Sequence, residues 1–262
     1  ILGALGQEGI EPEMIDAVLV THEHIDHVRS VRAIGRKCCN AVFITSRGTS
    51  ENTENFKYIP DERLRIVQAG EEVCLERSTE DTVTQEDAAG QRLLIRAFAL
   101  SHDAAEPVSY TFTYGEEKLA VVTDTGVITE EIYEAVRDAD RLVFEANHDE
   151  DLLMFGEYPY PVKVRIKGDH GHLSNRYAGE TLARLLTDRR AACEAQGEPE
   201  GSIRQNSDDR RPLEIMLAHL SFHNNAPFYA RSTIEAILKE SGFERDVHYT
   251  LTIAAKDDIC MM

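Results

Sequence analysis

A dense group of side chains that can bind metal lies near the start of the sequence. Residues 21–27 read THEHIDH and place three imidazoles and two carboxylates, those of Glu23 and Asp26, in six consecutive positions. His22 and His24 are two positions apart, so in an extended chain both imidazoles leave on the same side. Asp26 and His27 follow where the chain turns towards a helix. Imidazole and carboxylate are ligands for Zn, Mn or Fe, so the run predicts a metal site.

The elements expected around this run alternate between strands and helices. Residues 16–21 form a short apolar, β-branched run typical of a buried strand, and residues 26–37 are expected to form a helix. Thr129 is expected to cap a further helix, whose first turn carries Glu130 and Glu131. Other strands are expected at 41–45, 93–100, 108–114, 118–123, 141–145, 213–219 and 249–254, and other helices at 175–186 and 226–242. This order indicates an α/β fold.

The domain organisation expected from the sequence is a single domain over residues 1–262. Residues 76–92 and 188–211 are charged and poor in large apolar side chains, so we expect both to be polar insertions in that domain. The chain does not begin with Met, and its first residues are typical of the end of a helix. We therefore expect the natural N-terminal strands to be missing from this sequence.

The H-x-H-x-D-H run strongly resembles the signature of the metallo-β-lactamase superfamily. The resemblance implies an αββα sandwich of two mixed β-sheets with helices on the outer faces and a metal site at one edge. It also implies three later ligands, each following a strand. By the resemblance, one metal would be held by His22, His24 and His102 and the other by Asp26, His27 and His219, with Asp124 bridging them.

The type of residue at position 124 separates branches of this superfamily. Class B β-lactamases typically carry a cysteine where Asp124 stands, so the aspartate favours branches resembling ribonuclease Z, glyoxalase II and lactonases. Two divalent metals about 3.5–4 Å apart can share a hydroxide and lower the pKa of its parent water towards roughly 7. Asp26 is expected to orient that hydroxide. The identity of the metals stays open between Zn and Mn, with Fe possible.

Two later segments resemble the Glu-Ala-Thr and His-Ser-Thr elements of ribonuclease Z. They are residues 145–149 (EANHD) and 171–175 (GHLSN). The resemblance implies that His172 contacts the scissile phosphate or protonates the leaving group and that Glu145 supports it. The alternative is that His172 merely packs or caps a helix.

The residues around this pair supply further candidates for substrate binding. Ser174 or Asn175 is expected to cap a helix whose N-terminus offers N–H donors to a phosphate. His148 is expected either to contact substrate or to hydrogen-bond a metal ligand.

Over most of its length the chain resembles the YycJ/WalJ group, regarded as exonucleases that degrade double-stranded DNA from 5′ to 3′. The resemblance implies double-stranded DNA as the macromolecule bound. The resembling stretches are 22–27, 101–107, 145–149, 158–161, 168–175 and 219–225.

The net charge of −19 opposes nonspecific attraction to nucleic acid and to anionic membranes. Two local basic clusters offset it. Arg29, Arg32 and Arg36 have the spacing of one helix face, and residues 163–167 carry three more cations shortly before His172. We expect Arg29 and Arg32 to contact a sugar–phosphate backbone, although an ordinary solvated surface has the same pattern.

The cysteines and the hydropathy favour the cytoplasm. Five cysteines include no C-x-x-C pair, which favours a reducing compartment over a disulfide framework. No apolar run approaches the roughly 20 residues of a membrane span.

Three functions stay open at this point. They are a phosphodiesterase acting on DNA, a thioester or lactone hydrolase resembling glyoxalase II, and a fold that binds metal or a partner without turnover. The choice of DNA or RNA, the exo- or endonuclease mode and the oligomeric state are left open by the sequence.

Overall fold

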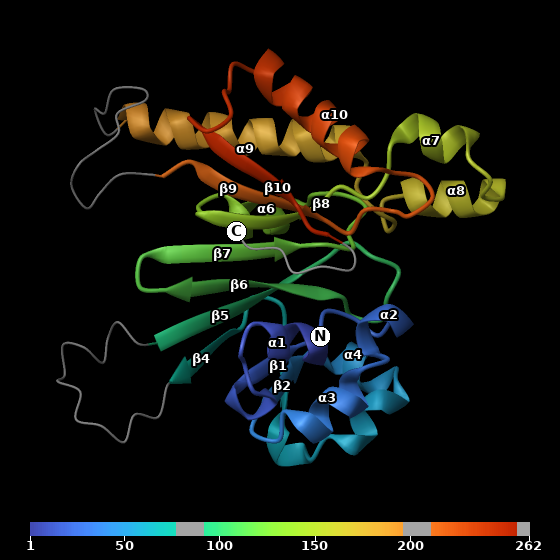
Figure 1. Cartoon of the computed structure of the whole chain (residues 1–262), viewed down its shortest axis with the longest axis vertical. Coiled ribbons are helices and arrows are strands. Elements are labelled where there is room, and N and C mark those ends of the chain that lie inside the picture. The colour runs from blue at the N-terminus through green and yellow to red at the C-terminus, as the bar shows by residue number, and fades with distance from the viewer. Residues whose placement is uncertain (77–91, 196–210, 256–262) are drawn as a thin grey trace.

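Two stacked β-sheets with helices on both outer faces make up the molecule (Figure 1). The computed structural model describes residues 1–76, 92–195 and 211–255. In Figure 1, helices α9 and α10 cover the larger sheet, and helices α1 and α3 lie beyond the smaller one. The expected αββα sandwich is confirmed.

The larger sheet has seven strands and the smaller has three. The order in the larger sheet is β10-β9-β8-β7-β6-β5-β4, with parallel and antiparallel pairs, and in the smaller it is β1-β2-β3. Their bounds are β1 (Ala17–Leu19), β2 (Val42–Thr45), β3 (Leu64–Ile66), β4 (Glu72–Glu76), β5 (Arg92–Ala99), β6 (Val108–Tyr114), β7 (Glu117–Val122), β8 (Arg141–Glu145), β9 (Leu213–Ala218) and β10 (Tyr249–Ile253).

The expectation of two mixed sheets is wrong for the smaller one. Its strands pair in parallel throughout, because helical crossovers return the chain to the same end after β1 and again after β2.

The helices are α1 (Leu2–Gln7), α2 (Ile25–Val28), α3 (Val31–Lys37), α4 (Arg47–Glu51), α6 (Glu130–Val136), α7 (Glu150–Phe155), α8 (Tyr160–Lys167), α9 (Asn175–Ala195) and α10 (Pro227–Glu240).

Two expected helices have different bounds in the structure. The single helix expected over 26–37 is two short ones, α2 and α3. Helix α9 continues to Ala195, past the expected start of an insertion at 188, because its charged residues there hold it to the fold. Arg189 donates to the Ala139 carbonyl at 2.6 Å, and the Arg190 guanidinium lies 4.9 Å from the Phe243 ring centre. Of the two expected insertions, 76–92 and 188–211, the structure describes only residues 76, 92, 188–195 and 211.

Three groups of buried apolar side chains hold the layers together. The largest fills the space between the seven-stranded sheet and α6, α9 and α10; the second lies between the two sheets; the third lies between the small sheet and α3. Tyr110 connects the sheets directly, since its buried hydroxyl donates to the carbonyls of Val20 and Ile44 at 2.9 and 3.2 Å. That contact fixes the end of β1, from which the first histidines project.

The topology directs several strand ends to one edge of the sandwich. Strands β7, β8 and β9 pair in parallel, and β5 has the same direction because two antiparallel pairings separate it from β7. Their carboxyl ends therefore lie together.

Thr129 caps α6 as expected, accepting from the Ile132 amide at 3.2 Å. Within the described residues no helix is long and apolar enough to span a bilayer.

Candidate metal centre

The first group of candidate ligands combines two residues that follow β1 with one that follows β5. His22, His24 and His102 each place a ring nitrogen within 4.8 Å of the others. The His22 side chain is buried, and its Nε2 has no hydrogen-bond partner. Burying an unpaired polar nitrogen costs on the order of 1–3 kcal/mol, and coordination of a cation would remove that cost. The donor set fits Zn or Mn.

The second group lies directly beside the first. Asp26, His27 and His219 form one cluster within the same 4.8 Å limit, and Asp124 clusters with both early histidines His22 and His27. The Asp124 Oδ1 is 3.3 Å from the His219 Nε2, and its buried Oδ2 is 3.6 Å from the His27 Nε2 with no hydrogen-bond partner. The seven expected ligands therefore converge, with the aspartate between the two groups.

Two of these residues have a backbone conformation that L-residues rarely adopt. Asp124 has a φ of 60° and His219 a φ of 57°, each directly after its strand. Such left-handed backbone costs on the order of 1–3 kcal/mol and persists where surrounding contacts fix it. The Asn147 amide provides one such contact, donating to the His219 carbonyl at 2.9 Å. The conformation turns both side chains towards the histidines that follow β1.

The Nδ1 atoms of four imidazoles have partners that leave Nε2 for a metal. Thr21 Oγ1 lies 3.0 Å from the His22 Nδ1 and 3.2 Å from the His27 Nδ1. The Gly171 carbonyl accepts from the His102 Nδ1 at 3.1 Å, and Glu145 Oε1 accepts from the His219 Nδ1 at 2.7 Å. Partners of this kind fix the tautomer and the orientation of metal-binding histidines.

Burial also favours the neutral form of one of these rings. It lowers the pKa of His22 to about 2, with nearby histidines adding to the effect, so this ring is unprotonated at neutral pH. A neutral imidazole can bind metal, whereas a protonated one cannot.

Glu145 lies at the centre of the hydrogen-bond network. Its fully buried carboxylate accepts from the ring Nδ1 atoms of His172 (2.9 Å) and His219 (2.7 Å), and from the amides of Thr125 (3.2 Å) and Leu173 (3.1 Å). Burial acts to raise the pKa of Glu145, but the hydrogen bonds from the two histidines lower it to about 2. Conversely, burial opposes protonation of His219, yet Glu145 and Asp124 raise its pKa to about 9 in the metal-free protein, so a cation bound there would displace a proton from this ring.

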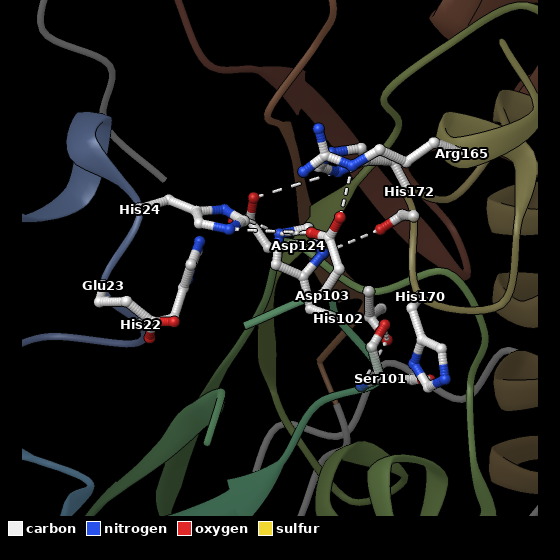
Figure 2. A network of polar contacts seen from close by, with 12 residues as sticks. His22, Glu23, His24, Ser101, His102, Asp103, Asp124, Arg165, His170 and His172 are labelled. Carbon is white, nitrogen blue, oxygen red and sulfur yellow. Dashed lines mark hydrogen bonds and ion pairs between the residues drawn. The ribbon is translucent and has the colours of Figure 1, made fainter. Parts of the chain in front are cut away.

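An ion pair that the sequence analysis missed joins α8 to the first group. Asp103 Oδ1 lies 3.6 Å from the His102 Nε2 and 3.8 Å from the His24 Nε2. Its other oxygen accepts from the guanidinium of Arg165, as Figure 2 shows. Burial acts to raise the pKa of Asp103, but the bond from Arg165 lowers it.

Two cations of the expected second basic cluster have partners within the protein. Arg165 pairs with Asp103, and Lys163 donates to the carbonyls of Met154 and Gly156 at 2.8 and 2.7 Å. Both cations stabilise the α7–α8 segment. Lys167, the third member, lines a cavity beside His172.

The other expected substrate-binding residues differ in their surroundings. Ser174 is the N-cap of α9, accepting from the Tyr177 amide at 3.1 Å and donating to Glu150 at 3.2 Å. Of the two expected caps it is therefore Ser174 that caps α9, whereas the buried side-chain amide of Asn175 pairs with that of Asn225 at 3.0 and 2.8 Å. His148 is buried, and neither ring nitrogen has a hydrogen-bond partner.

The two arginines expected to contact a nucleic-acid backbone are exposed. Because the helix is interrupted, Arg29 is the C-cap of α2, whereas Arg32 lies in α3. The Arg32 guanidinium lies 3.9 Å from the ring centre of Tyr58, so it packs on the helical layer of the small sheet.

Comparison with known proteins gives a family and several relatives. Residues 4–192 match the family described as Beta-lactamase superfamily domain. The chain is 31% identical over 229 residues to Exodeoxyribonuclease YycJ of Bacillus anthracis, covering 87% of this chain and 73% of that protein. It is 31% identical over 234 residues to Exodeoxyribonuclease WalJ of Streptococcus pneumoniae, covering 89% and 74% respectively.

Solved structures support the same fold at low sequence identity. The metallo-β-lactamase fold protein YhfI from Bacillus subtilis is 15% identical with a TM-score of 0.55, covering 93% of this chain and 76% of that one. Zn²⁺-bound PqqB from Methylobacterium extorquens is 17% identical with a TM-score of 0.51, covering 92% and 71%.

Proposed function

Because this chain belongs to the metallo-β-lactamase superfamily and is a metal-dependent hydrolase of that fold, we propose that its substrate is DNA. Specifically, we propose a phosphodiesterase that removes nucleotides from double-stranded DNA in the 5′-to-3′ direction. The observation that carries the proposal is the Glu145–His172 pair beside the two ligand groups. The exodeoxyribonuclease names of its relatives support the same substrate class.

The proposed cofactor is a pair of divalent cations, Zn or Mn. His22, His24 and His102 would hold one, Asp26, His27 and His219 the other, and Asp124 would contact both. When bound, such cations supply Lewis acidity and lower the pKa of water. Asp26 has an exposed side chain 3.7 Å from the His27 ring, so it can accept a hydrogen bond from the attacking water.

His172 is the proposed proton donor to the leaving oxygen. Its ring centre lies 5.1 Å from that of His102 and 5.2 Å from that of His219, so it borders both ligand groups. Glu145 accepts the Nδ1 hydrogen, which leaves Nε2 free to face substrate and stabilises a positive charge on the ring. A phosphodiester needs such a donor because its alkoxide leaving group must be protonated.

The main test is hydrolysis of 5′-labelled duplex DNA in the presence of Mn²⁺ or Zn²⁺. The expected result is release of labelled mononucleotide, lost in His24→Ala and retained in His248→Ala, which removes a half-buried histidine next to β10. Intact DNA under conditions where the protein carries metal would contradict the proposal.

If Arg29 and Arg32 contact the sugar–phosphate backbone of DNA, replacing both with alanine should weaken the salt dependence of DNA binding.

A second candidate is the hydrolysis of a thioester or lactone. It is favoured by the internal pairing of Arg165 and Lys163, which removes part of the basic surface that a polyanion needs in a protein of net charge −19. A panel of acyl substrates separates the two candidates, since rapid thioester cleavage without DNA cleavage selects the second.

As for the compartment of the protein, we propose the cytoplasm, because the four cysteines within the described residues are unpaired.

A further inference from the structure

A cavity of about 400 Å³ opens beside His172. Its walls come from the loop after β7, the loop after β8, the end of α8 and the first turns of α9. The residues used below are His148, Glu150, Lys167, Asp169, His172 and Arg176, all of which line it. This volume is within the range of pockets that enclose small ligands.

His148, one of the residues that line this cavity, has an unsatisfied hydrogen-bond donor and acceptor. Its side chain is 1% exposed, and both ring nitrogens lack a partner. A neutral imidazole offers one donor and one acceptor, and leaving both unpaired in the interior is costly. A ligand with its own donors and acceptors would satisfy the ring.

The cavity wall also carries groups that suit an anion. Lys167 contributes an ammonium group, and Arg176 lines the wall while pairing with Glu180 at 2.9 Å. The N-terminus of α9, a helix of 21 residues capped by Ser174, opens on the same side and has the positive end of the helix dipole.

The same wall contains hydrogen-bond acceptors as well. The carboxylates of Glu150 and Asp169 can accept from amino groups of a ligand. A ligand that combines an anionic group with a polar heterocycle fits this lining, and a nucleoside 5′-phosphate has both.

His172 is shared between the cavity and the candidate metal centre. It lines the cavity, and its Nδ1 clusters with Asp124, Glu145 and His219 within 4.8 Å. A ligand in the cavity is therefore adjacent to the place where a phosphodiester would react. We propose that the cavity holds the 5′-terminal nucleotide of the strand being cut; this inference rests on the proposed nuclease function.

The proposed step balances as a hydrolysis. The oxygen of water forms a bond to phosphorus, and the bond between phosphorus and the 3′-oxygen of the terminal nucleotide breaks. His172 supplies the proton to that oxygen, and the proton lost by water restores the ring after product release. A strand with a 5′-phosphate releases a nucleoside 5′-monophosphate, and the shortened strand keeps a new 5′-phosphate. A cavity that holds a terminal nucleotide favours attack at a chain end, as in the proposed exonuclease mode.

The test measures binding of deoxyadenosine 5′-monophosphate to the metal-loaded protein by calorimetry. Lys167→Ala should raise the Kd about tenfold because it removes a cation from a charge-assisted contact. His148→Leu should raise it by a similar factor, and Lys57→Ala, an exposed lysine on the small-sheet side, should leave it unchanged. Lys167 is exposed, so its replacement does not threaten folding even if His148→Leu does.

The outcomes separate this inference from the function on which it rests. If the wild-type protein degrades linear DNA but both cavity variants bind the nucleotide as tightly as wild type, the cavity assignment is overturned and the nuclease proposal stands. If the wild-type protein degrades no DNA, the nuclease proposal itself fails. Weaker nucleotide binding in Lys167→Ala, together with DNA degradation by wild type and resistance of closed circular DNA, supports the assignment.

Discussion

Replacing Thr21 with valine tests whether one hydroxyl orients ligands in both groups. Valine has nearly the same shape as threonine but cannot accept the hydrogen bonds from the Nδ1 atoms of His22 (3.0 Å) and His27 (3.2 Å). The backbone contact of Thr21, whose carbonyl accepts from the Val108 amide at 3.0 Å, is unaffected. The change therefore acts on the orientation of the two rings.

The expected loss of metal affinity is about 10- to 100-fold. Losing the partner of one metal-binding histidine typically weakens binding by this factor, which is about 1.4–2.7 kcal/mol. The two hydrogen bonds, at about 0.5–1.5 kcal/mol each, add up to a similar range. Each imidazole would then be free to rotate, and its Nδ1 could compete with Nε2 for the cation.

The assay is competition for Zn²⁺ against a chromophoric chelator, with Thr45→Val as the matched control. Thr45 is buried next to the same strand, and its hydroxyl donates to the Val20 carbonyl at 3.0 Å. Both variants should lose about 1 kcal/mol in the free energy of unfolding, but Thr45→Val should keep its metal affinity. Equal metal affinity in Thr21→Val and wild type would refute the reasoning, as would an equal loss in both variants.

Three further predictions follow from the site. First, burial lowers the pKa of His148 from 6.5 to about 4. Below pH 6.5 the unfolded chain therefore takes up a proton that the folded protein does not accept until about pH 4, so unfolding becomes more favourable. The metal-free protein should lose about 2 kcal/mol from this residue between pH 6.5 and 4.5, measured by urea unfolding, and His148→Leu should lose correspondingly less. Second, Gly171→Ala should lower the metal content, which elemental analysis measures. An added Cβ would collide with the Ile166 carbonyl and so displace the Gly171 carbonyl, which accepts from the His102 ring. Third, Glu145→Gln should reduce DNA hydrolysis by at least about 100-fold in kcat, since an amide cannot stabilise a charged His172.

Each of these three has a result that would contradict it. The first fails if stability is flat between pH 6.5 and 4.5, or if His148→Leu shows the same decline as wild type. Normal metal content in Gly171→Ala contradicts the second. Its control is Gly3→Ala in α1, where an added Cβ meets nothing. Gly70 is unsuitable as a control because its φ of 85° would strain an alanine. The third is contradicted by an unchanged kcat in a Glu145→Gln protein whose metal content is normal.

The early histidines could be singled out from the residues alone, because four candidate ligands follow one strand within six positions. The grouping of His102, Asp124 and His219 with them was implied by the family resemblance, and the structure brings these side chains together. Parallel strands then bring their carboxyl ends to one edge, which is a general property of such sheets. The fold was predictable for the same reason, since alternating strands and helices leave few arrangements.

The parts that the sequence analysis missed depend on distant pairing. Arg165 and Asp103 are 62 residues apart, and a basic run on α8 gave no sign that the arginine would meet that aspartate. The role of Thr21 also became visible only with the rings in place, although a hydroxyl directly before the first histidine was a usable signal. The backbone at Asp124 and His219 was likewise unpredictable, because a φ near 60° in these residues is set by contacts across the site.

The four hydrogen bonds accepted by Glu145 couple parts of the protein that would otherwise vary independently. A substitution that shifts His172 to suit a different leaving group also moves the carboxylate that orients His219. New substrate preferences on this scaffold should therefore arise from changes in the cavity wall, at positions such as Lys167 or Arg176, while the central acid stays fixed. Directed evolution towards other phosphodiesters would accumulate its mutations there.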